Sequence, residues 1–470
     1  MVHEQPRRIG DHAVVLGASV AGLAAAATLA HRFDTVTIVE RDPIPPVGEG
    51  RRSVPQGRHA HLLLPAGLRA LGQLLPGIES DLDEHGAHVI PAPEFRFNIG
   101  AGRLALSDDR LAITGATRPL LEGVIRTRVA DLPKVTLLAG QSVNGLTATD
   151  DRGRITGVRL AAGSGADGTL PADLVVDATG RRSDSPAWLE TFGYDAPDDE
   201  RMEVGVHYST RLFRRYPTDL GGCRHVAIAT RPGERRGGLA LAVEGDRWLV
   251  TLVGMVGERP PTELDDFVAY AAGLWRPDLH EVVDGAEPVS EAVTGGFPAH
   301  LRRRYDRLRR FPERYVVTGD AVCSLSPVYG QGMTVAIREA QVLGEVLDRH
   351  GLDHVGRRCF RRGRSVVDTA WTLATSADLA DPDVEGRRTL GWRILNRYVG
   401  RAMRAATEDP VVADALLAVN ALVAPPPTMF VPRVARRLLR RLPENQNDDA
   451  RTTPDGGEYG RRPAVDGAAT

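Results

Sequence analysis

Lysine is almost absent from this chain. Lys134 is the only lysine, and arginine supplies the remainder of the 59 basic residues. A reaction that needs a lysine amine therefore has a single candidate residue. The formal net charge is −2 at neutral pH, so the chain has no general electrostatic attraction to nucleic acid, and no nucleic-acid partner is expected.

Cysteine is also scarce. Cys223, Cys323 and Cys359 lie far apart, and no CxxC pair occurs among the 470 residues. This spacing gives no disulfide framework, so we expect free thiols in a reducing, cytoplasmic compartment. His59 and His61 lie on one side of an extended segment, but no third ligand has suitable spacing, and no metal site is predicted.

Long apolar runs are missing as well. No uncharged apolar run reaches the roughly 18 residues that a membrane-spanning helix needs. Gly17, Ser19 and Gly22 interrupt the first apolar stretch, which therefore indicates a strand, a turn and a helix rather than a signal peptide. The 42% hydrophobic and 26% charged content is typical of a soluble globular protein, and the length suggests two or three domains.

The first motif lies near the N-terminus. The run HAVVLG is followed by GASVAG, an alanine-rich helix and the strand TVTIVERD, which together predict a βαβ unit. Such a unit binds an adenine dinucleotide when glycines allow a tight turn and an acid ends the second strand. Ser19 stands where a second glycine usually lets the backbone approach the pyrophosphate. The predicted cofactor contacts here are Gly17, Ser19, Ala21, Gly22, Glu40 and Arg41.

A second motif, GDAVCSLSPVYGQGM, joins a buried strand to a helix at residues 319–333. Glycine suits places where the backbone approaches another group closely, and helix N-termini attract anions. Together with the first motif, this stretch resembles the GD…P…G signature of flavoproteins similar to p-hydroxybenzoate hydroxylase. The resemblance implies FAD, with Asp320 accepting a hydrogen bond from the ribityl chain. The residues that it places under the isoalloxazine are Pro327, Gly330, Gln331, Gly332 and Met333.

Three further segments fit this resemblance. DLVVDATGRRS is similar to the middle signature of the superfamily, with two residues separating Asp177 from Gly180. TRPLLE places Arg118 where these enzymes hold an arginine against the FAD diphosphate, a task that suits the planar guanidinium. GRHAH runs beside the flavin in the resemblance, with Arg58 and His61 next to the ring. A structural role for the histidine stays open.

The resemblance implies an α/β fold with three parts. These are a Rossmann-like FAD-binding domain, an inserted and mostly antiparallel β-sheet substrate domain, and a helical C-terminal region. We predict that the FAD-binding domain comprises residues 1–84, 116–189 and 298–345. The substrate domain takes a sheet segment at 85–115 and a β-sheet domain at 190–297. The helical region covers 346–444, and residues 445–470, which have few apolar side chains, are predicted to be disordered.

Several segments narrow the resemblance. VPQGRHAHLLL, STRLFR, SPVYGQGM and DTAWTLATSADL look like the flavin-dependent epoxidases of polyether biosynthesis, of the monensin and lasalocid type. This resemblance covers nearly the whole chain up to about residue 385. It implies transfer of one oxygen atom from a flavin C4a-hydroperoxide to an alkene of a hydrophobic, polyketide-like or carrier-bound intermediate. O2 is then the co-substrate, and the electrons come from NAD(P)H or from a separate flavin reductase.

Other functions remain open. An aromatic or aliphatic hydroxylase of a secondary metabolite uses the same oxidant in a different pocket, and a reductase or desaturase of isoprenoid chains uses the same fold. A halogenase is disfavoured because the chain has no W-x-W-x-I-P segment and a single, remote lysine. A non-enzymatic flavin-binding protein is the alternative outside enzymology. No Ser/His/Asp or paired-carboxylate constellation is found, so no catalytic side chain is predicted.

The segment FVPRVARRLLRRL, at residues 430–442, predicts a basic amphipathic helix. Such a helix either touches an anionic surface, such as a membrane or an acidic carrier protein, or packs on the body of the protein with its arginines in solvent. The sequence leaves both possibilities open.

Overall fold

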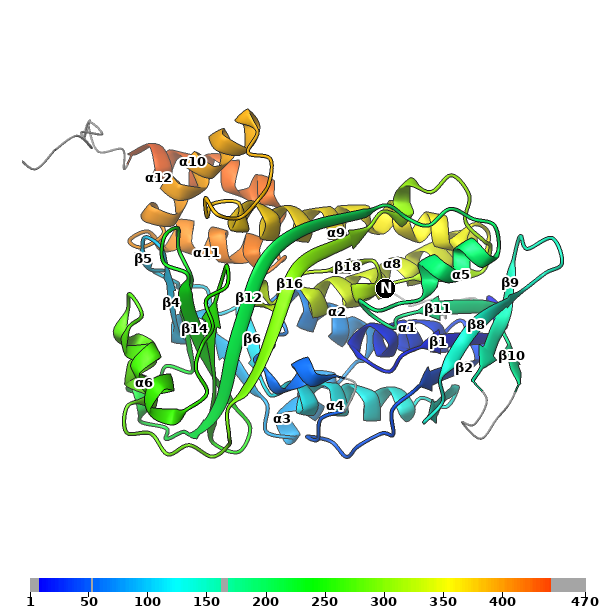
Figure 1. The fold of residues 1–470 in the computed structure, drawn as a ribbon, viewed down its shortest axis with the longest axis horizontal. Helices are drawn as coiled ribbons and strands as arrows, with labels where there is room; N and C mark the ends of the chain where they lie inside the picture. Colours follow the sequence, from blue (N-terminus) through cyan, green and yellow to red (C-terminus); the bar gives the residue numbers. More distant parts are fainter. Residues whose placement is uncertain (1–7, 52–53, 162–167, 441–470) are drawn as a thin grey trace, which may run out of the picture.

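The computed structural model describes residues 8–51, 54–161 and 168–440 (Figure 1). The predicted fold class is confirmed: the chain combines a parallel sheet covered by helices, a larger and mostly antiparallel sheet, and a helical C-terminal region. The tail predicted for residues 445–470 lies outside the described residues.

The parallel sheet contains the predicted βαβ unit. β1 (Gly10–Leu16) leads through α1 (Val20–Ala30) to β2 (Phe33–Glu40), which pairs with β1 in parallel. The order of the five strands is β17-β11-β1-β2-β7. The three remaining strands are β7 (Val135–Ala139), β11 (Leu174–Asp177) and β17 (Tyr315–Val317).

The two faces of this sheet belong to different cores. Along β1, Ala13 and Val15 pack into a core with the helices, whereas Val14 and Leu16 point into the core on the opposite face. This alternation follows from the period of two in a strand. The helices of the first core include α1, α2 (Pro65–Leu74), α4 (Arg118–Ala130) and α8 (Gly332–His350).

The second face carries a three-stranded antiparallel sheet and a small helix. The strands are β8 (Val143–Ala148), β9 (Ile155–Leu160) and β10 (Thr169–Pro171), and the helix is α5 (Ser185–Thr191). The segment SVNGLTATDDRGRITGVRLAA predicts a hairpin with its turn at residues 151–153, and the antiparallel pairing of β8 with β9 confirms it.

The apolar pattern of HLLLPAGLRALGQLLPGI, residues 61–78, predicts one helix that begins near Pro65, but the structure divides it. The helix that begins at Pro65 ends at Leu74, and a separate helix, α3 (Ile78–Glu84), follows. Gly77 between them has φ of +90°, a conformation that glycine adopts at little cost, and Pro76 cannot continue the preceding hydrogen-bond ladder.

The larger sheet has eight strands in the order β18-β16-β12-β15-β14-β13-β4-β5. Its pairs are antiparallel except β13 with β4, which run in parallel. The strands are β4 (Phe95–Ile99), β5 (Gly102–Arg103), β12 (Asp199–Arg214), β13 (His225–Ile228), β14 (Arg236–Val243), β15 (Arg247–Gly254), β16 (Val293–Arg303) and β18 (Cys323–Ser324). A separate pair is formed by β3 (His88–Pro91) and β6 (Ala112–Gly115).

Figure 1 shows the long strands β12 and β16 side by side, arching from the large sheet toward the parallel sheet. Because side chains alternate along them, the large sheet has two apolar faces. One packs with α6 (Leu264–Ala272) and α7 (His280–Val283) in the core that includes Phe213 and Trp248. The other carries a smaller apolar cluster around Val206 and Tyr208.

The C-terminal region is helical, as predicted. α9 (Val355–Asp378) precedes α10 (Leu390–Ala405), α11 (Pro410–Asn420) and α12 (Pro432–Arg440). The last three share a core with Ile99 and Leu104, at the end of the large sheet. Within the described chain, no helix has the length and apolar character needed to cross a bilayer.

Candidate active site

The GASVAG turn is shaped by two glycines. Gly17 has φ of +97°, and a Cβ there would lie 2.9 Å from the carbonyl oxygen of Ala178. Gly22 lies in the first turn of α1, and a Cβ on it would come within 2.9 Å of the carbonyl carbon of Gly17 and closer still to its oxygen. The turn therefore requires glycine at both positions, as the sequence predicts.

Glu40 is the predicted acid at the end of β2, and its side chain is almost fully buried. Its Oε2 accepts hydrogen bonds from the backbone N–H of Ala18 at 2.8 Å and from Nη1 of Arg51 at 2.6 Å. Its Oε1 accepts from the backbone N–H of Asp42 at 3.0 Å. Each carboxylate oxygen has two acceptor sites, so Oε1 keeps one free for a ribose hydroxyl.

Ser19 replaces the usual second glycine and connects the turn to α4. Its hydroxyl donates to Glu122 at 3.1 Å and accepts from Arg51 and Arg118, each at 3.2 Å. Arg118 also donates to Glu122 at 3.0 Å, and Arg51 bonds the same carboxylate. Burial opposes ionisation of Glu122, but the charges of Arg118 and Arg51 outweigh it and lower its pKa. The predicted diphosphate-binding arginine is thus held beside the GASVAG turn.

The second motif folds back onto the first. Gly319 has φ of +65°, and a Cβ on it would lie 2.8 Å from Cβ of Ala21 in α1. Next to it, Asp320 lies beside Gly180 of the middle signature and Gly332 at the start of α8: added Cβ atoms at these glycines would lie 3.9 Å from its Cβ and 3.8 Å from its Oδ1. Three motifs separated by more than a hundred residues therefore meet around Gly319 and Asp320.

The environment of Asp320 fits a bound polyhydroxyl group. Its side chain is exposed by surface area, yet protein surrounds it closely enough that desolvation raises its pKa, against the charges of Arg118 and Arg181. Within the described chain it makes no hydrogen bond or ion pair. A carboxylate that is exposed yet closely surrounded by protein, and that has no partner in the described chain, suits an acceptor for ribityl hydroxyls. The residues at the predicted FAD site thus fit that cofactor.

The middle signature is organised by Asp177, which is fully buried at the end of β11. Its carboxylate accepts from the backbone N–H and hydroxyl of Thr179, at 2.8 and 2.6 Å, and from the hydroxyl of Ser183 at 2.5 Å. The hydroxyl of Ser185 donates to it as well. These bonds fix the turn that carries exposed Thr179 and places half-buried Gly180 beside Asp320, so Asp177 shapes the site without facing the cofactor.

The segment predicted to lie under the isoalloxazine is a short 3-10 turn, Pro327–Tyr329, followed by the start of α8. Gly330 has φ of +65° and packs against Leu62, the residue that follows the GRHAH segment. α8 begins without a side-chain cap, so its first-turn N–H groups are available to an anionic or carbonyl-rich edge.

The side chains of Gln331 and Met333 are both buried in contacts with the protein. The Gln331 side chain is buried and donates to the carbonyl oxygen of Asn420 in α11 at 3.1 Å. Met333 is buried in the core beneath α8. Only the backbone of these two residues remains available to the ring.

A buried hydrogen-bond chain anchors this segment. Ser326 N–H donates to Nδ1 of His300 at 3.1 Å, which leaves the ring proton on Nε2 for Asp378, 2.6 Å away. Asp378 also accepts from the Tyr329 hydroxyl at 2.5 Å. The residues on both sides of Pro327 are thus tied through β16 to the end of α9.

The two histidines of the GRHAH segment have different surroundings. His59 is buried, bonds Thr210 of β12 at 2.8 Å and makes an edge contact with Tyr208, with ring centroids 4.5 Å apart. Burial lowers the pKa of His59 to about 4, so it is a neutral structural link to the large sheet.

His61 is partly exposed, and the charges of Arg118 and Glu122 both act on its pKa. Burial lowers its pKa to about 3, and the neighbouring arginine acts in the same direction. Arg58 and Arg41 are both exposed, Arg58 at the end of a short 3-10 turn. No group of three metal-ligating side chains occurs among the residues that the structure describes.

An apolar surface of the large sheet borders the same region. Val206 and Tyr208 of β12 form a cluster with Val253 and Met255, on the face opposite the main core of that sheet. Phe297 of β16 packs against this cluster and lies under the guanidinium of Arg181, 5.0 Å from the ring centroid. The cluster can therefore supply an apolar wall next to the DATG turn.

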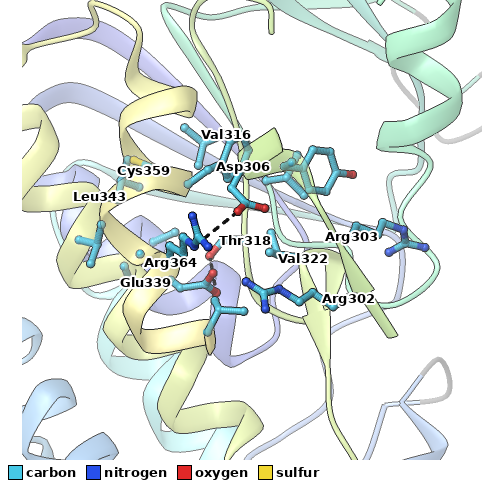
Figure 2. A pocket seen from close by; sticks show the side chains of 18 residues that line it. Arg302, Arg303, Asp306, Val316, Thr318, Val322, Glu339, Leu343, Cys359 and Arg364 are labelled. Carbon is cyan, nitrogen blue, oxygen red and sulfur yellow. Dashed lines mark hydrogen bonds and ion pairs between the residues drawn. The ribbon is translucent and has the colours of Figure 1, made fainter. Parts of the chain in front are cut away.

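Figure 2 shows a small cavity lined by residues on both sides of the GD motif, among them Thr318 and Val322. Glu339 of α8 lies beside Thr318 there, and Arg364 reaches Asp306. The cavity has a volume of about 30 Å³, room for no more than a few water molecules, so it is not a substrate pocket. Its role is structural: Glu339 accepts from the backbone N–H of Gly319 at 2.8 Å.

Glu339 should make stability depend on pH. Burial raises its pKa to about 7, against the bonds from Gly319 and Thr318. Above about pH 4.5 the Glu339 carboxyl loses its proton in the unfolded state, whereas the folded state keeps that proton up to about pH 7. The free energy of unfolding therefore falls as pH rises from about 4.5 to about 7. Glu339→Gln should remove this fall, leaving the variant more stable than the unmodified protein by roughly 2 kcal/mol at about pH 8 and nearly equal at about pH 5.

Urea unfolding across this pH range measures the difference. Glu345→Gln is the matched control because Glu345 lies on the same helix but is exposed, and its substitution should leave the pH profile unchanged. A Glu339→Gln profile parallel to that of the unmodified protein would contradict the assignment.

The sequence did not single out Arg51, Glu122 or Glu339. Glu122 follows Arg118 by four residues on α4, a spacing that brings side chains together on a helix and could have been noticed. Arg51 lies in a loop rich in glycine and proline, where no periodicity indicates which arginine turns inward.

No protein-family model matches the chain. Comparison with curated proteins finds Protein Rv3254 of Mycobacterium tuberculosis, 32% identical over 418 residues, which cover 86% of this chain and 88% of that protein. Kynurenine 3-monooxygenase of Salinispora tropica is 28% identical over 361 residues, which cover 72% of this chain and 73% of the relative.

Comparison with solved structures finds the same fold. PqsL of Pseudomonas aeruginosa, described as a probable FAD-dependent monooxygenase, superposes with a TM-score of 0.60 at 18% identity, covering 79% of this chain and 97% of PqsL. At this identity the likeness concerns the fold alone, which is that of an FAD-dependent monooxygenase.

Proposed function

This chain belongs to the same family as Protein Rv3254 and is an FAD-dependent monooxygenase, and from this premise we propose its reaction. The enzyme transfers one oxygen atom from O2 to an alkene of a hydrophobic, polyketide-like substrate. The observation that carries the proposal is the meeting of the three motifs around Gly319 and Asp320, beside an apolar face of the large sheet. The first feature suits FAD, and the second suits a substrate with few polar groups.

When bound, reduced FAD supplies the chemistry that activates O2 for transfer of one oxygen atom. The chain itself holds and orients the groups. Asp320 would accept from the ribityl hydroxyls, Glu40 from a ribose hydroxyl, and Arg118 would bind the diphosphate. The first turn of α8 would direct its N–H groups at the ring, where its positive end stabilises negative charge on the pyrimidine edge.

The apolar cluster of the large sheet would exclude water and hold the substrate. Its side chains contribute no acid or base, in keeping with a reaction in which an electron-rich alkene attacks an activated oxygen. Tyr329, tied to Asp378, keeps the turn next to the ring in one position. The reaction therefore depends on enclosure and orientation rather than on a catalytic triad.

Hydroxylation of an aromatic or aliphatic secondary metabolite is the second candidate. The relative named kynurenine 3-monooxygenase favours it, because that name describes oxygen transfer to an aromatic compound. A halogenase is less well supported, since Lys134 precedes β7, the edge strand farthest from β17 and the GD motif. NAD(P)H or a separate flavin reductase would supply the electrons.

The proposal is tested by reducing the FAD-loaded protein without oxygen, mixing it with O2 and following its absorbance. We expect a transient near-ultraviolet absorbance before the oxidised flavin spectrum returns. Polyenes and aromatic amines offered in turn should separate the two candidates, because only the accepted class gains the mass of one oxygen atom.

Direct return of the oxidised spectrum, with no transient and no oxygenated product from either class, would exclude oxygen transfer. It would favour the reductase or desaturase instead. An oxygenated aromatic product with intact polyenes would replace epoxidation by hydroxylation.

A further inference from the structure

We propose that the outer surface of α10 and α12 docks on a membrane surface containing anionic lipids. The first observation is a group of exposed apolar side chains, here named the C-terminal patch. Leu390 is 74% exposed and Ile394 is 62% exposed, although both are large and apolar. The C-terminal patch consists of Leu390, Ile394, Leu395, Phe430 and Val431.

The members of the C-terminal patch lie close together. Leu390, Ile394 and Tyr398 are spaced by four residues and share one side of α10. Tyr398 stacks on Phe430, with ring centroids 4.7 Å apart, and its hydroxyl donates to the carbonyl oxygen of Met429 at 2.5 Å. The segment that carries Phe430 and Val431 is thereby held against α10, on the side of the helix that carries Leu390 and Ile394.

The second observation is the sign of the surrounding charge. No Asp or Glu occurs from residue 386 to 407 or from residue 420 to 440. α10 carries four arginines, at 393, 397, 401 and 404, and α12 exposes Arg433, Arg436 and Arg437. Among these described side chains, only Arg437 forms an ion pair, with Asp409. The apolar patch is thus bordered by unpaired positive charge.

This combination indicates the occupant. An interfacial helix inserts apolar side chains at the headgroup boundary while its arginines bind anionic headgroups. Arginine stems also pack on apolar surface with the guanidinium in water. A second copy of the chain is a poor occupant, because a two-fold interface would bring the same arginines face to face.

The position of the patch is compatible with docking. Figure 1 shows α10 and α12 at one end of the molecule, away from the parallel sheet. On α12 the apolar side chains of Val434 and Leu438 are buried against the other C-terminal helices, so that helix presents arginines outward. The basic helix predicted from the sequence is therefore packed on the body of the protein, and α10 contributes the exposed apolar part.

The test is cosedimentation of the full chain with vesicles. We expect binding to mixed phosphatidylglycerol and phosphatidylcholine vesicles, little binding to phosphatidylcholine alone, and weaker binding as salt increases. Leu390→Glu with Ile394→Glu should abolish binding. Arg393→Gln with Arg397→Gln should weaken it about tenfold or more, since each arginine near an anionic surface contributes several-fold.

Matched variants elsewhere test the location. Val89→Glu changes an exposed apolar residue far from α10, and Arg357→Gln with Arg361→Gln removes two exposed arginines from α9. Both should leave binding unchanged. The proposal is overturned if anionic vesicles are not bound or if the control variants weaken binding equally. Two further outcomes would overturn it, both in a chain that binds no lipid. In one, the patch variants abolish self-association of the chain; in the other, they abolish binding to an acidic carrier protein.

Discussion

Gly22→Ala should yield a protein that retains no FAD and is destabilised by about 4 kcal/mol or more. The added methyl group would overlap the carbonyl oxygen of Gly17, a backbone atom that cannot rotate away. Relief requires α1 to move from β1, and this movement opens the turn that binds the dinucleotide. Urea unfolding and the flavin absorbance of the purified protein measure the two effects.

Gly400→Ala is the matched control for Gly22→Ala. Gly400 lies inside α10, and an added Cβ meets no atom within 4 Å. Alanine is the better helix former, so this substitution should raise the free energy of unfolding by about 0.5 to 1 kcal/mol and leave FAD binding intact. Retention of FAD by Gly22→Ala would show that α1 and the turn adapt, contrary to the packing described above.

Asp177→Ala should be nearly as damaging, with a loss of about 4 kcal/mol. The substitution leaves the backbone N–H of Thr179 and the buried hydroxyls of Ser183 and Ser185 without their acceptor. Each unsatisfied buried donor costs about 1 to 3 kcal/mol, and the costs combine because the donors belong to one network. Urea unfolding of the variant measures the loss.

Asp173→Ala provides the comparison on the same stretch of chain. Asp173 also accepts two backbone hydrogen bonds, from Asp11 and His12, but it is partly exposed, so water can replace it. We expect a loss of about 1 kcal/mol. Equal losses at the two positions would mean that the burial of Asp177 contributes nothing, and the account of the DATG turn would be wrong.

The local parts of the fold could be predicted because they follow from spacing. The βαβ unit, the hairpin near residue 152 and the helices at Pro65 and Arg118 all depend on neighbours within a few residues. The parallel pairing of β13 with β4 joins segments more than a hundred residues apart, and no sequence period encodes it. The short break at Gly77 was hidden by the apolar pattern that continues across it.

The candidate site divides in the same way. Gly17 and Gly22 were predicted because their roles are set by local backbone geometry. Gly319 and Asp320 were predicted from the resemblance of the second motif to the GD…P…G signature. The partners of Ser19 were not, since Arg51 and Glu122 reach it from separate elements. The contact of the Gln331 side chain with α11 was not predicted either, because the position of that helix depends on the packing of the whole C-terminal region.

The three cysteines can be used to measure how cooperatively the chain unfolds. Cys359, Cys223 and Cys323 belong to three different hydrophobic cores. All three are buried, and burial raises the pKa of each thiol, so each should resist alkylation until its own core opens. Their modification rates would then report whether the cores open as one cooperative unit or as three. The chain thus carries a native probe of its own folding cooperativity in each layer.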